Sequence, residues 1–384
     1  DPTDNDAVPR GKQVLSPGGI FYTPTSGIWQ TVWMEAVPQI YIDDYRVTTD
    51  IDKGEVTFTL LAGGDQAGGN HTYNVSVRHG SDIVAAGSAS LGTPLTLAIP
   101  DVELWEPEHP FLYDARIVLG DDAVDTYFGM RKISLQRDGS WYRLALNNTF
   151  LFQMGPLDQG FWPDGVYTAP SDEALMNDIV TMKRMGFNMV RKHIKVEPRR
   201  WYYWCDRLGL LVWQDMPGEN YGGKGGVDNN PDYFERELTA LVEKHSNAPS
   251  IVMWVIFNEG GGQGGKEYTS RFVNLVRRLD KTRLVNEASG WNHYGYGDIY
   301  DNHPYPAPSA PSTTRPQALA DGEYGGIKYA IDGHLWSGNG WGYASVSNAA
   351  EFDSTICNYF GKLAYYKTYK GLSAAVYTQL SDVE

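Results

Sequence analysis

From about residue 141 to residue 384, short apolar runs alternate with stretches in which apolar residues recur at helical periodicity. Few folds are compatible with this alternation. The run at 251–257 is entirely apolar, which is typical of a strand buried on both faces. Strands that alternate with helices form a parallel sheet with helical crossovers. Eight such runs predict a (β/α)8 TIM barrel, whose usual length is about 250 residues.

The strands of this barrel are expected near residues 150–154, 188–190, 209–213, 251–257, 284–285, 299–300, 319–320 and 374–377. Helices are expected over 171–185, from Pro198, over 232–245 and over 268–280. The interval from Ser289 to Ile299 is too short for a full helix, so we expect an irregular barrel there. A doubly wound sheet is the alternative, but no strand is followed by a glycine-rich dinucleotide fingerprint.

The preceding residues have a different sequence pattern. Residues 38–140 alternate apolar and polar side chains, as at 56–60 and 73–77, with turn residues at short intervals. This pattern predicts a small antiparallel β-sandwich, which we interpret as a support module without catalytic residues. Residues 1–37 are rich in proline and glycine and contain one aromatic segment, from Phe21 to Trp33.

Charge and composition exclude several classes of function. The formal net charge of −15 opposes binding to nucleic acid or to an anionic membrane. The two cysteines, Cys205 and Cys357, are too few for a disulfide framework and lack the spacing of zinc ligands. No apolar run reaches the roughly 18 residues of a membrane span. We therefore expect no nucleic acid, membrane insertion, metal or cofactor.

In a TIM barrel the chemistry takes place at the C-terminal ends of the strands. The residues at those ends include several acids and no serine elbow, Cys–His pair or metal motif. Paired carboxylates without a metal or cofactor point to hydrolysis of a glycosidic bond. The strand-end residues are Asp158, His193, Asp215, Asn258, Glu259, Asn286, Glu287, His303 and Glu323.

Three of these acids are candidates for catalysis. Glu259 follows an apolar strand and precedes three glycines, which leave room for a bulky substrate. Glu287 lies in a second Asn-Glu dipeptide, and we interpret it as a hydrogen-bonded structural acid. Glu323 is flanked by glycines at a strand end, where the residues alone leave open a turn or an active-site role.

Four motifs occur in the order seen in glycoside hydrolase family 2, namely VRKH at 190–193, LVWQDMP at 211–217, WVIFNE at 254–259 and GEYGG at 322–326. The segment LDQGFWPDG at 157–165 adds to the likeness. The chain therefore resembles this family, which holds β-galactosidases, β-glucuronidases and β-mannosidases. The resemblance implies an immunoglobulin-like sandwich over 38–140, a catalytic barrel over 141–384, and the end of a jelly-roll sugar-binding domain over 1–37. It also suggests a fragment of a larger enzyme.

Carried over position by position, the resemblance makes Glu259 the general acid/base and Glu323 the nucleophile. Asn258 matches the residue that hydrogen-bonds the sugar 2-hydroxyl. Trp336 and Trp341 are candidates for a wall on which a sugar ring stacks. The further substrate-binding residues that it implies are Asp158, Arg191, His193, Asp215, His303, Tyr305 and Trp336.

The function implied is that of a retaining exo-β-glycosidase, similar to a β-galactosidase, acting on a carbohydrate substrate by double displacement. Two alternatives stay open: a β-glucuronidase or β-galacturonidase specificity, and a catalytically silent carbohydrate-binding fragment. Arg191, Lys192 and Lys195 could suit a uronic acid, but we favour structural ion pairs for them. We expect the two catalytic carboxyl groups about 5–5.5 Å apart. The oligomeric state is left open, and a periplasmic or extracellular location is favoured over a cytoplasmic one.

Overall fold

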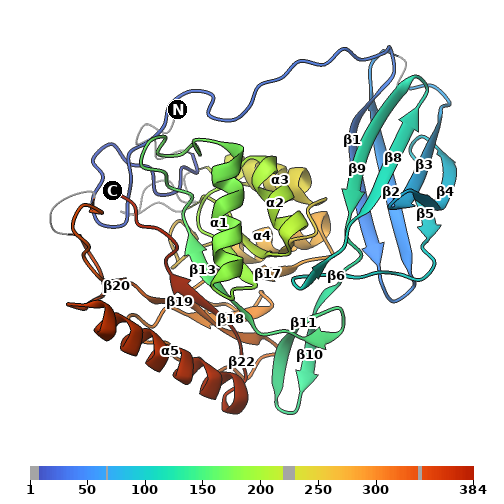
Figure 1. The fold of residues 1–384 in the computed structure, drawn as a ribbon. Helices are drawn as coiled ribbons and strands as arrows, with labels where there is room; N and C mark the ends of the chain where they lie inside the picture. Colours follow the sequence, from blue (N-terminus) through green and yellow to red (C-terminus); the bar gives the residue numbers. More distant parts are fainter. Residues whose placement is uncertain (1–7, 66–67, 219–229, 336–339) are drawn as a thin grey trace.

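The computed structural model describes residues 8–65, 68–218, 230–335 and 340–384. An all-β sandwich lies beside a strand-and-helix barrel, and a long N-terminal segment runs from the barrel to the sandwich (Figure 1). Both ends of the described chain lie on the side of the barrel away from the sandwich (Figure 1). The N-terminal segment contacts the C-terminal residue there, because the Thr23 hydroxyl donates a 2.9 Å hydrogen bond to the Glu384 carboxylate.

The sandwich consists of a three-stranded sheet, β1-β2-β5, and a four-stranded sheet, β4-β3-β8-β9, both antiparallel. In β2, Val56, Phe58 and Leu60 are buried in turn, which confirms the alternation seen in the sequence. Strands β4 and β9 were not predicted. The strands are β1 (Tyr41–Asp50), β2 (Glu55–Gly63), β3 (Thr72–His79), β4 (Asp82–Ser90), β5 (Leu95–Ala98), β8 (Tyr113–Leu119) and β9 (Asp122–Phe128).

Short strands connect the sandwich to the barrel. They are β6 (Trp105–Glu106), β7 (His109–Pro110), β10 (Ile133–Asp138), β11 (Trp141–Leu146) and β12 (Thr149–Phe150). Tyr142 of β11 pairs with Ala318, the first residue of a barrel strand. Leu144 and Leu146 of the same strand join the apolar cluster inside the barrel. The β10–β11 hairpin therefore closes the N-terminal end of the barrel.

Eight parallel strands form the barrel wall: β13 (Gln153–Asp158), β14 (Met189–Lys192), β15 (Leu211–Asp215), β16 (Ile251–Val255), β17 (Leu284–Asn286), β18 (Ile299–Asn302), β19 (Ala318–Gly325) and β22 (Leu372–Thr378). Strand β22 pairs with both β19 and β13, so the sheet curves back on itself and the doubly wound alternative is wrong. Between β17 and β18 the described chain has no ladder, which confirms the expected irregularity. The Asp298 amide, just before β18, donates to the Val285 carbonyl, and the Asn286 side chain donates to Asp301.

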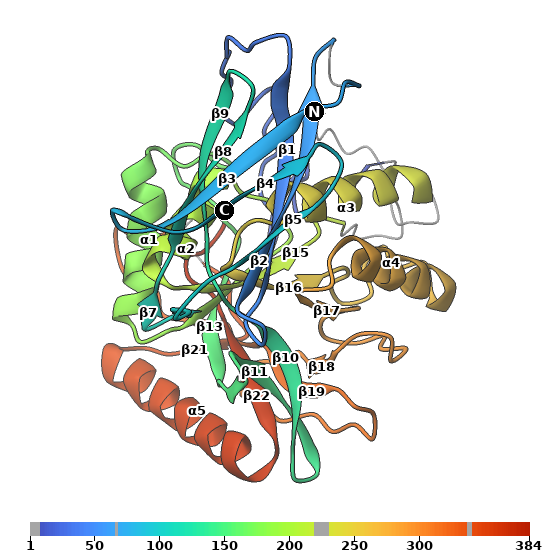
Figure 2. The ribbon, with the colours of Figure 1, turned by 90° about the vertical axis from the view of Figure 1, so that its right-hand side faces the viewer.

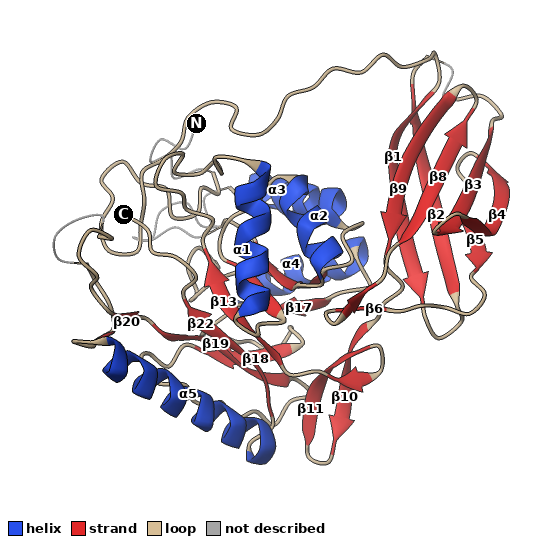
Figure 3. Ribbon diagram, in the orientation of Figure 1, coloured by secondary structure: helices blue, strands red, loops and turns tan. Residues whose placement is uncertain are grey.

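The helices are α1 (Asp172–Arg184), α2 (Arg199–Leu208), α3 (Pro231–His245), α4 (Lys266–Leu279) and α5 (Ala349–Tyr369). The first four match the predicted ones and surround the half of the barrel that faces the sandwich (Figures 2 and 3). Helix α5, which was not predicted, packs Tyr359 and Leu363 against Leu372 of β22. The short strands β20 (Ile327–Lys328) and β21 (Ala344–Ser345) pair with each other. In the described ranges no helix is both long and apolar enough to cross a membrane.

The N-terminal segment divides into a packed part and an exposed part. One isolated bridge joins Gln13 to Tyr22, and no strand is formed in residues 8–37. The Tyr22 ring is buried against Phe161 and Tyr167 of the barrel. A second group of apolar side chains remains exposed. It consists of Ile28, Val32, Trp33 and Met34. The jelly-roll origin of this segment stays a prediction.

Arg131, between β9 and β10, fastens the sandwich linker to the barrel. It is buried, and its guanidinium donates to the backbone carbonyls of Pro249, Thr282 and Ile251 at 2.8–2.9 Å. These carbonyls belong to the loops that precede β16 and β17 and to β16 itself. One side chain thus satisfies three barrel carbonyls near the strand starts.

Replacing Arg131 with methionine should lower the free energy of unfolding by about 3 kcal/mol, since it removes the side-chain donor of the Pro249 and Thr282 carbonyls and one of the two side-chain donors of the Ile251 carbonyl. Urea unfolding followed by tryptophan fluorescence measures the change. Arg116→Met is the matched control, because Arg116 forms an exposed ion pair with Asp125 on the sandwich. Equal effects of the two substitutions would contradict this role.

Candidate active site

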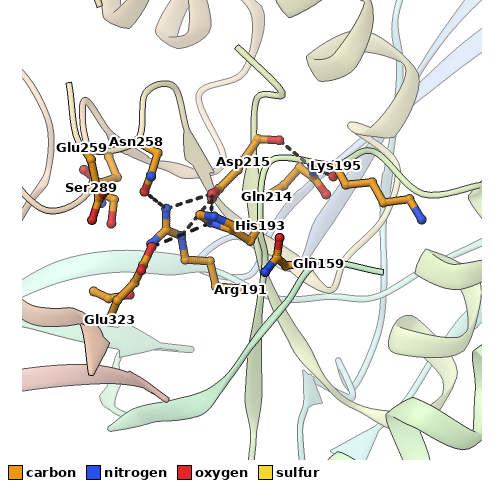
Figure 4. Close-up of polar contacts among 12 residues, drawn as sticks. Gln159, Arg191, His193, Lys195, Gln214, Asp215, Asn258, Glu259, Ser289 and Glu323 are labelled. Atoms are coloured by element: carbon orange, nitrogen blue, oxygen red, sulfur yellow. Dashed lines mark hydrogen bonds and ion pairs between the residues drawn. The ribbon is translucent and has the colours of Figure 1, made fainter. Parts of the chain in front are cut away.

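The C-terminal strand ends bring most of the predicted site residues together (Figure 4). Arg191 lies in β14 and Asp215 ends β15, while Glu323 lies near the end of β19. Asn258 and Glu259 follow β16, and a bridge between Asn258 and Ser289 extends the pairing of β16 with β17. The remaining predicted residues of this group are His193, which follows β14, and His303 and Tyr305, which follow β18.

Arg191 is the centre of this arrangement and is fully buried. Its Nε and Nη2 atoms donate to the two oxygens of Asp215 at 3.1 and 2.8 Å. Nη2 also donates to Asn258 Oδ1 at 2.8 Å. Nη1 donates to Glu323 Oε1 at 3.0 Å and to the Gly322 carbonyl at 3.2 Å. All five N–H groups are thus engaged, which fixes the guanidinium and leaves it no donor for a ligand.

Glu323 is an ionised carboxylate held from both sides. Its side chain is 7% exposed, and its second oxygen accepts a 2.6 Å hydrogen bond from the Tyr305 hydroxyl. Burial alone would raise the pKa of Glu323, but the charges of His303, Arg191 and Lys12, together with the Tyr305 hydrogen bond, bring the pKa below its usual value. Such a carboxylate is suited to be a nucleophile.

His193 is buried beside Asp215, with Nδ1 3.2 Å from Asp215 Oδ2. Burial, and then the nearby cations Lys12 and Arg191, hold the pKa of His193 well below its ordinary value, so the ring is neutral. Burial raises the pKa of Asp215 to about 6 in spite of the Arg191 ion pair. Within the described chain neither ring nitrogen of His193 has a hydrogen-bond partner of good geometry.

Glu259 stands at the rim of the site in an uncommon backbone conformation, with φ at 51°. Its amide donates to the Ser289 carbonyl at 2.8 Å, which holds this conformation. The Glu259 carboxylate meets His303 Nδ1 at 2.7 Å. One oxygen of Glu259 and one oxygen of Glu323 lie within 4.8 Å of each other.

A chain of hydrogen bonds orients His303. Its Nε2 atom lies 2.9 Å from Ser289 Oγ, and that hydroxyl donates to Asp301 Oδ2 at 2.5 Å. Asp301 is buried and also accepts from the Gly290 amide. Because the Ser289 hydroxyl donates to Asp301, its Oγ accepts a hydrogen bond from the Nε2–H group of His303, and the Nδ1 atom faces Glu259. Sequence reasoning missed Ser289 and Asp301.

Glu259, His303 and Glu323 are the described residues that could converge on a metal ion, since one donor atom of each lies within 4.8 Å of the others. The contact of His303 Nδ1 with Glu259 has the length of a hydrogen bond, so these groups satisfy one another. We assign no metal or cofactor to this site.

Aromatic side chains flank the two carboxylates. The Tyr343 ring stacks on Tyr305 at 3.7 Å, and Trp341 packs edge-on against Tyr343. Trp341, which the sequence indicated, is 57% exposed, whereas Trp336 lies outside the described residues. Trp291, which sequence reasoning missed, is 46% exposed and donates to the Glu259 carbonyl at 2.6 Å. Its position just after the second Asn-Glu strand was the available signal.

Asp158 belongs to a separate buried cluster. One of its oxygens pairs with Lys192 Nζ at 2.5 Å, and the other accepts from the Gly160 amide. Glu197 pairs with both Lys192 and Lys195, at 3.0 and 3.1 Å. The prediction of structural ion pairs for these lysines and for Arg191 is confirmed. A sugar-binding role for Asp158 stays a prediction.

Glu287, the acid of the second Asn-Glu dipeptide, is fully buried. Its two oxygens accept from the backbone amides of Gly295 and Tyr296 at 2.7 and 2.8 Å. It therefore shapes the loop between β17 and β18, as expected of a structural acid.

A (β/α)8 barrel with paired carboxylates at its strand ends, beside a β-sandwich, is the architecture of a class of glycoside hydrolases. The model "Glycosyl hydrolases family 2" matches residues 40–131, and "Glycosyl hydrolases family 2, TIM barrel domain" matches residues 168–302. The chain belongs to glycoside hydrolase family 2.

Curated sequence relatives and solved structures with a similar fold include enzymes named as β-galactosidases, β-glucuronidases and a β-galacturonidase. A β-galactosidase of Oenococcus oeni is 29% identical over 301 residues, which is 71% of this chain and 28% of the relative. The β-D-glucuronidase of Dictyoglomus thermophilum has a TM-score of 0.69 at 18% identity, covering 88% of this chain and 62% of that one. The β-galacturonidase of Eisenbergiella tayi has a TM-score of 0.67 at 19% identity, covering 89% of this chain and 65% of that one. The chain thus spans under a third of that curated relative's length.

The lowered pKa of Glu323 makes a prediction about stability. Because its pKa in the folded chain lies below the ordinary 4.5, ionised Glu323 contributes stability that is fully present above about pH 4.5 and is lost as the pH falls through the folded value. On going from neutral pH to about pH 3, the free energy of unfolding should therefore fall more for the wild type than for Glu323→Gln. Urea unfolding at both pH values measures it.

The same comparison in an Arg191→Met background provides the control. The guanidinium is one of the groups that lower the pKa of Glu323, so its removal should reduce the pH-dependent part of the difference. An unchanged pH dependence in that background would contradict the role given to Arg191.

Proposed function

We propose that this chain carries the catalytic centre of a retaining exo-β-glycosidase that hydrolyses terminal β-linked sugars. The observation that carries the proposal is the close approach of Glu259 and Glu323, with one oxygen of each within 4.8 Å. Retaining glycosidases separate their carboxyl groups by about 5–5.5 Å, and inverting ones by about 6.5–9.5 Å to admit a water. The short separation supports double displacement.

In the first step, Glu323 attacks the anomeric carbon while Glu259 gives its proton to the departing glycosidic oxygen. The C–O bond to the leaving group breaks, and a covalent glycosyl ester forms on Glu323. In the second step, Glu259 takes a proton from water, which attacks the same carbon and releases the sugar and the Glu323 carboxylate. The environments of the two groups suit these roles, since Glu323 is held ionised and Glu259 faces a histidine.

The neighbouring residues have supporting roles in this proposal. Asn258, already oriented by Arg191, would bind the sugar 2-hydroxyl. The Tyr305 hydroxyl stabilises the carboxylate form of Glu323 in the resting site and when the ester is cleaved. Trp291 and Trp341 offer exposed rings on which a sugar can stack.

For the substrate we propose a β-galactoside, because the relatives with this name share sequence across both parts of the chain. Solved β-glucuronidases and a β-galacturonidase share the fold, which keeps uronides as the alternative substrate class. We further propose that 141–384 is the catalytic barrel, 38–140 an immunoglobulin-like support module, and 1–37 the end of a sugar-binding domain. These assignments apply to a chain that covers 28% of the length of the Oenococcus oeni relative.

The proposal is tested with 4-nitrophenyl β-glycosides of galactose, glucuronic acid, galacturonic acid and mannose. Glu259→Gln and Glu323→Gln should each lower turnover by about 10³-fold or more, since each removes a group that reacts with the substrate. Glu235→Gln, which alters an exposed ion pair with Arg271, is the matched control and should keep wild-type rates. Binding without turnover in the wild type would favour the silent carbohydrate-binding alternative.

Tyr305→Phe should lower kcat by about tenfold to a hundredfold, because it removes a hydrogen bond to a charged oxygen of the nucleophile. The loss of this bond raises the pKa of Glu323, so the acidic limb of the kcat/KM profile should move to higher pH. A pH–rate profile measures both effects. A lower kcat with an unmoved acidic limb would assign Tyr305 a packing role instead.

A further inference from the structure

The N-terminal segment lies directly against the ends of two barrel strands. The Gly11 amide donates to the Pro217 carbonyl at 3.0 Å, two residues beyond Asp215. Gly11 has φ at 65°, and a Cβ there would come within 2.6 Å of the Ile194 carbonyl, next to His193. Close contact and positive φ both require glycine at this position. The backbone before Lys12 is therefore fixed at the rim of the site.

The backbone at Lys12 is fixed from the other side as well, because its carbonyl accepts a 3.1 Å hydrogen bond from the buried Tyr22. Lys12 is only 6% exposed. Its ammonium makes no hydrogen bond or ion pair with any described residue, yet its charge lowers the pKa of both Glu323 and His193. An almost buried ammonium without a partner is costly unless a ligand or water provides acceptors.

His193 is a second group in the same place whose hydrogen-bonding capacity is not used, although its Nδ1 atom lies 3.2 Å from Asp215 Oδ2. It is 1% exposed, and both ring nitrogens lack a hydrogen-bond partner within the described ranges. A neutral imidazole donates through one nitrogen and accepts through the other, so it can bind a hydroxyl in either direction. The other cations nearby are already engaged, Arg191 by Asp215 and Glu323, and Lys192 by Asp158.

We propose that Lys12 and His193 form a subsite that binds one oxygen substituent of the sugar held against Glu323, with Lys12 as a specificity-determining residue contributed by the N-terminal segment. This inference rests on the proposed glycosidase function and deepens it. The shared chemistry is an acceptor oxygen close to the nucleophile, which a ring hydroxyl or the carboxylate of a uronic acid can supply. The segment 8–22 is then a part of the active site.

The test compares Lys12→Met with wild type on 4-nitrophenyl β-galactoside and β-glucuronide. Methionine keeps the length of the side chain and removes the charge. We expect KM for the preferred glycoside to rise at least about tenfold, as befits the loss of a charge-assisted hydrogen bond, with the melting temperature unchanged. Deoxygalactosides that lack the 3-, 4- or 6-hydroxyl identify the hydroxyl that Lys12 binds. Wild type and Lys12→Met should have the same KM for the deoxygalactoside that lacks this hydroxyl.

Two controls separate binding from packing. Lys53→Met removes an exposed lysine of the sandwich and should leave KM unchanged. Gln13→Ala removes the hydrogen bonds of Gln13 to Thr25 and Arg10, and so loosens the segment without removing the ammonium. If Gln13→Ala reproduces the full effect of Lys12→Met, the role of Lys12 is structural and the inference is overturned.

The outcomes also distinguish the two oxygen sources and the underlying function. A loss confined to the glucuronide identifies a carboxylate, and a loss confined to the galactoside identifies a hydroxyl. If the wild type hydrolyses neither substrate, the subsite is tested by calorimetry with the lactams of galactonic and glucaric acid, which need no turnover. Lys12→Met should then bind the lactam at least about tenfold more weakly than the wild type. Unchanged KM and unchanged lactam affinity, or no lactam binding by inactive wild type, would overturn the inference.

Discussion

The buried guanidinium of Arg191 organises the active end of the barrel. Its five donors reach Asp215 on β15, Asn258 after β16, and Gly322 and Glu323 on β19, so one side chain from β14 sets the spacing of four strand ends. A buried charge must be paired and fully hydrogen-bonded, or the chain loses stability. The same requirement that holds the fold together here also fixes the position of the Glu323 carboxylate.

The two carboxylates of the proposed mechanism differ because their surroundings differ. Glu323 is enclosed between Arg191 and Tyr305 and keeps its charge. Glu259 lies at the rim, on a backbone turn with positive φ, and faces His303. The proposed nucleophile and proton donor need such different environments, and the barrel provides them by placing Glu323 within a strand and Glu259 in a loop.

The sequence predicted the barrel strands well, because the residues of a strand such as β16 are all buried and all apolar. Strand β15 is also buried throughout and is apolar up to Gln214. Sequence reasoning missed β4, in which six of the nine residues are alanine, glycine or serine, since small residues give no clear alternation. It also missed α5, whose face toward the barrel buries only Tyr359 and Leu363. The outline of the fold was therefore readable where burial is complete.

The sequence by itself determined which acids stand at strand ends, because an apolar run followed by Glu259 or a glycine-flanked Glu323 is a local pattern. Only the tertiary structure decided what these acids face. The hydrogen bond between Glu259 and His303, which continues to Ser289 and Asp301, joins two strand ends, and the charge of Lys12 acts on the distant Glu323. Local patterns carry no information on such contacts, since closing the barrel and laying the N-terminal segment over its rim are what bring these side chains together.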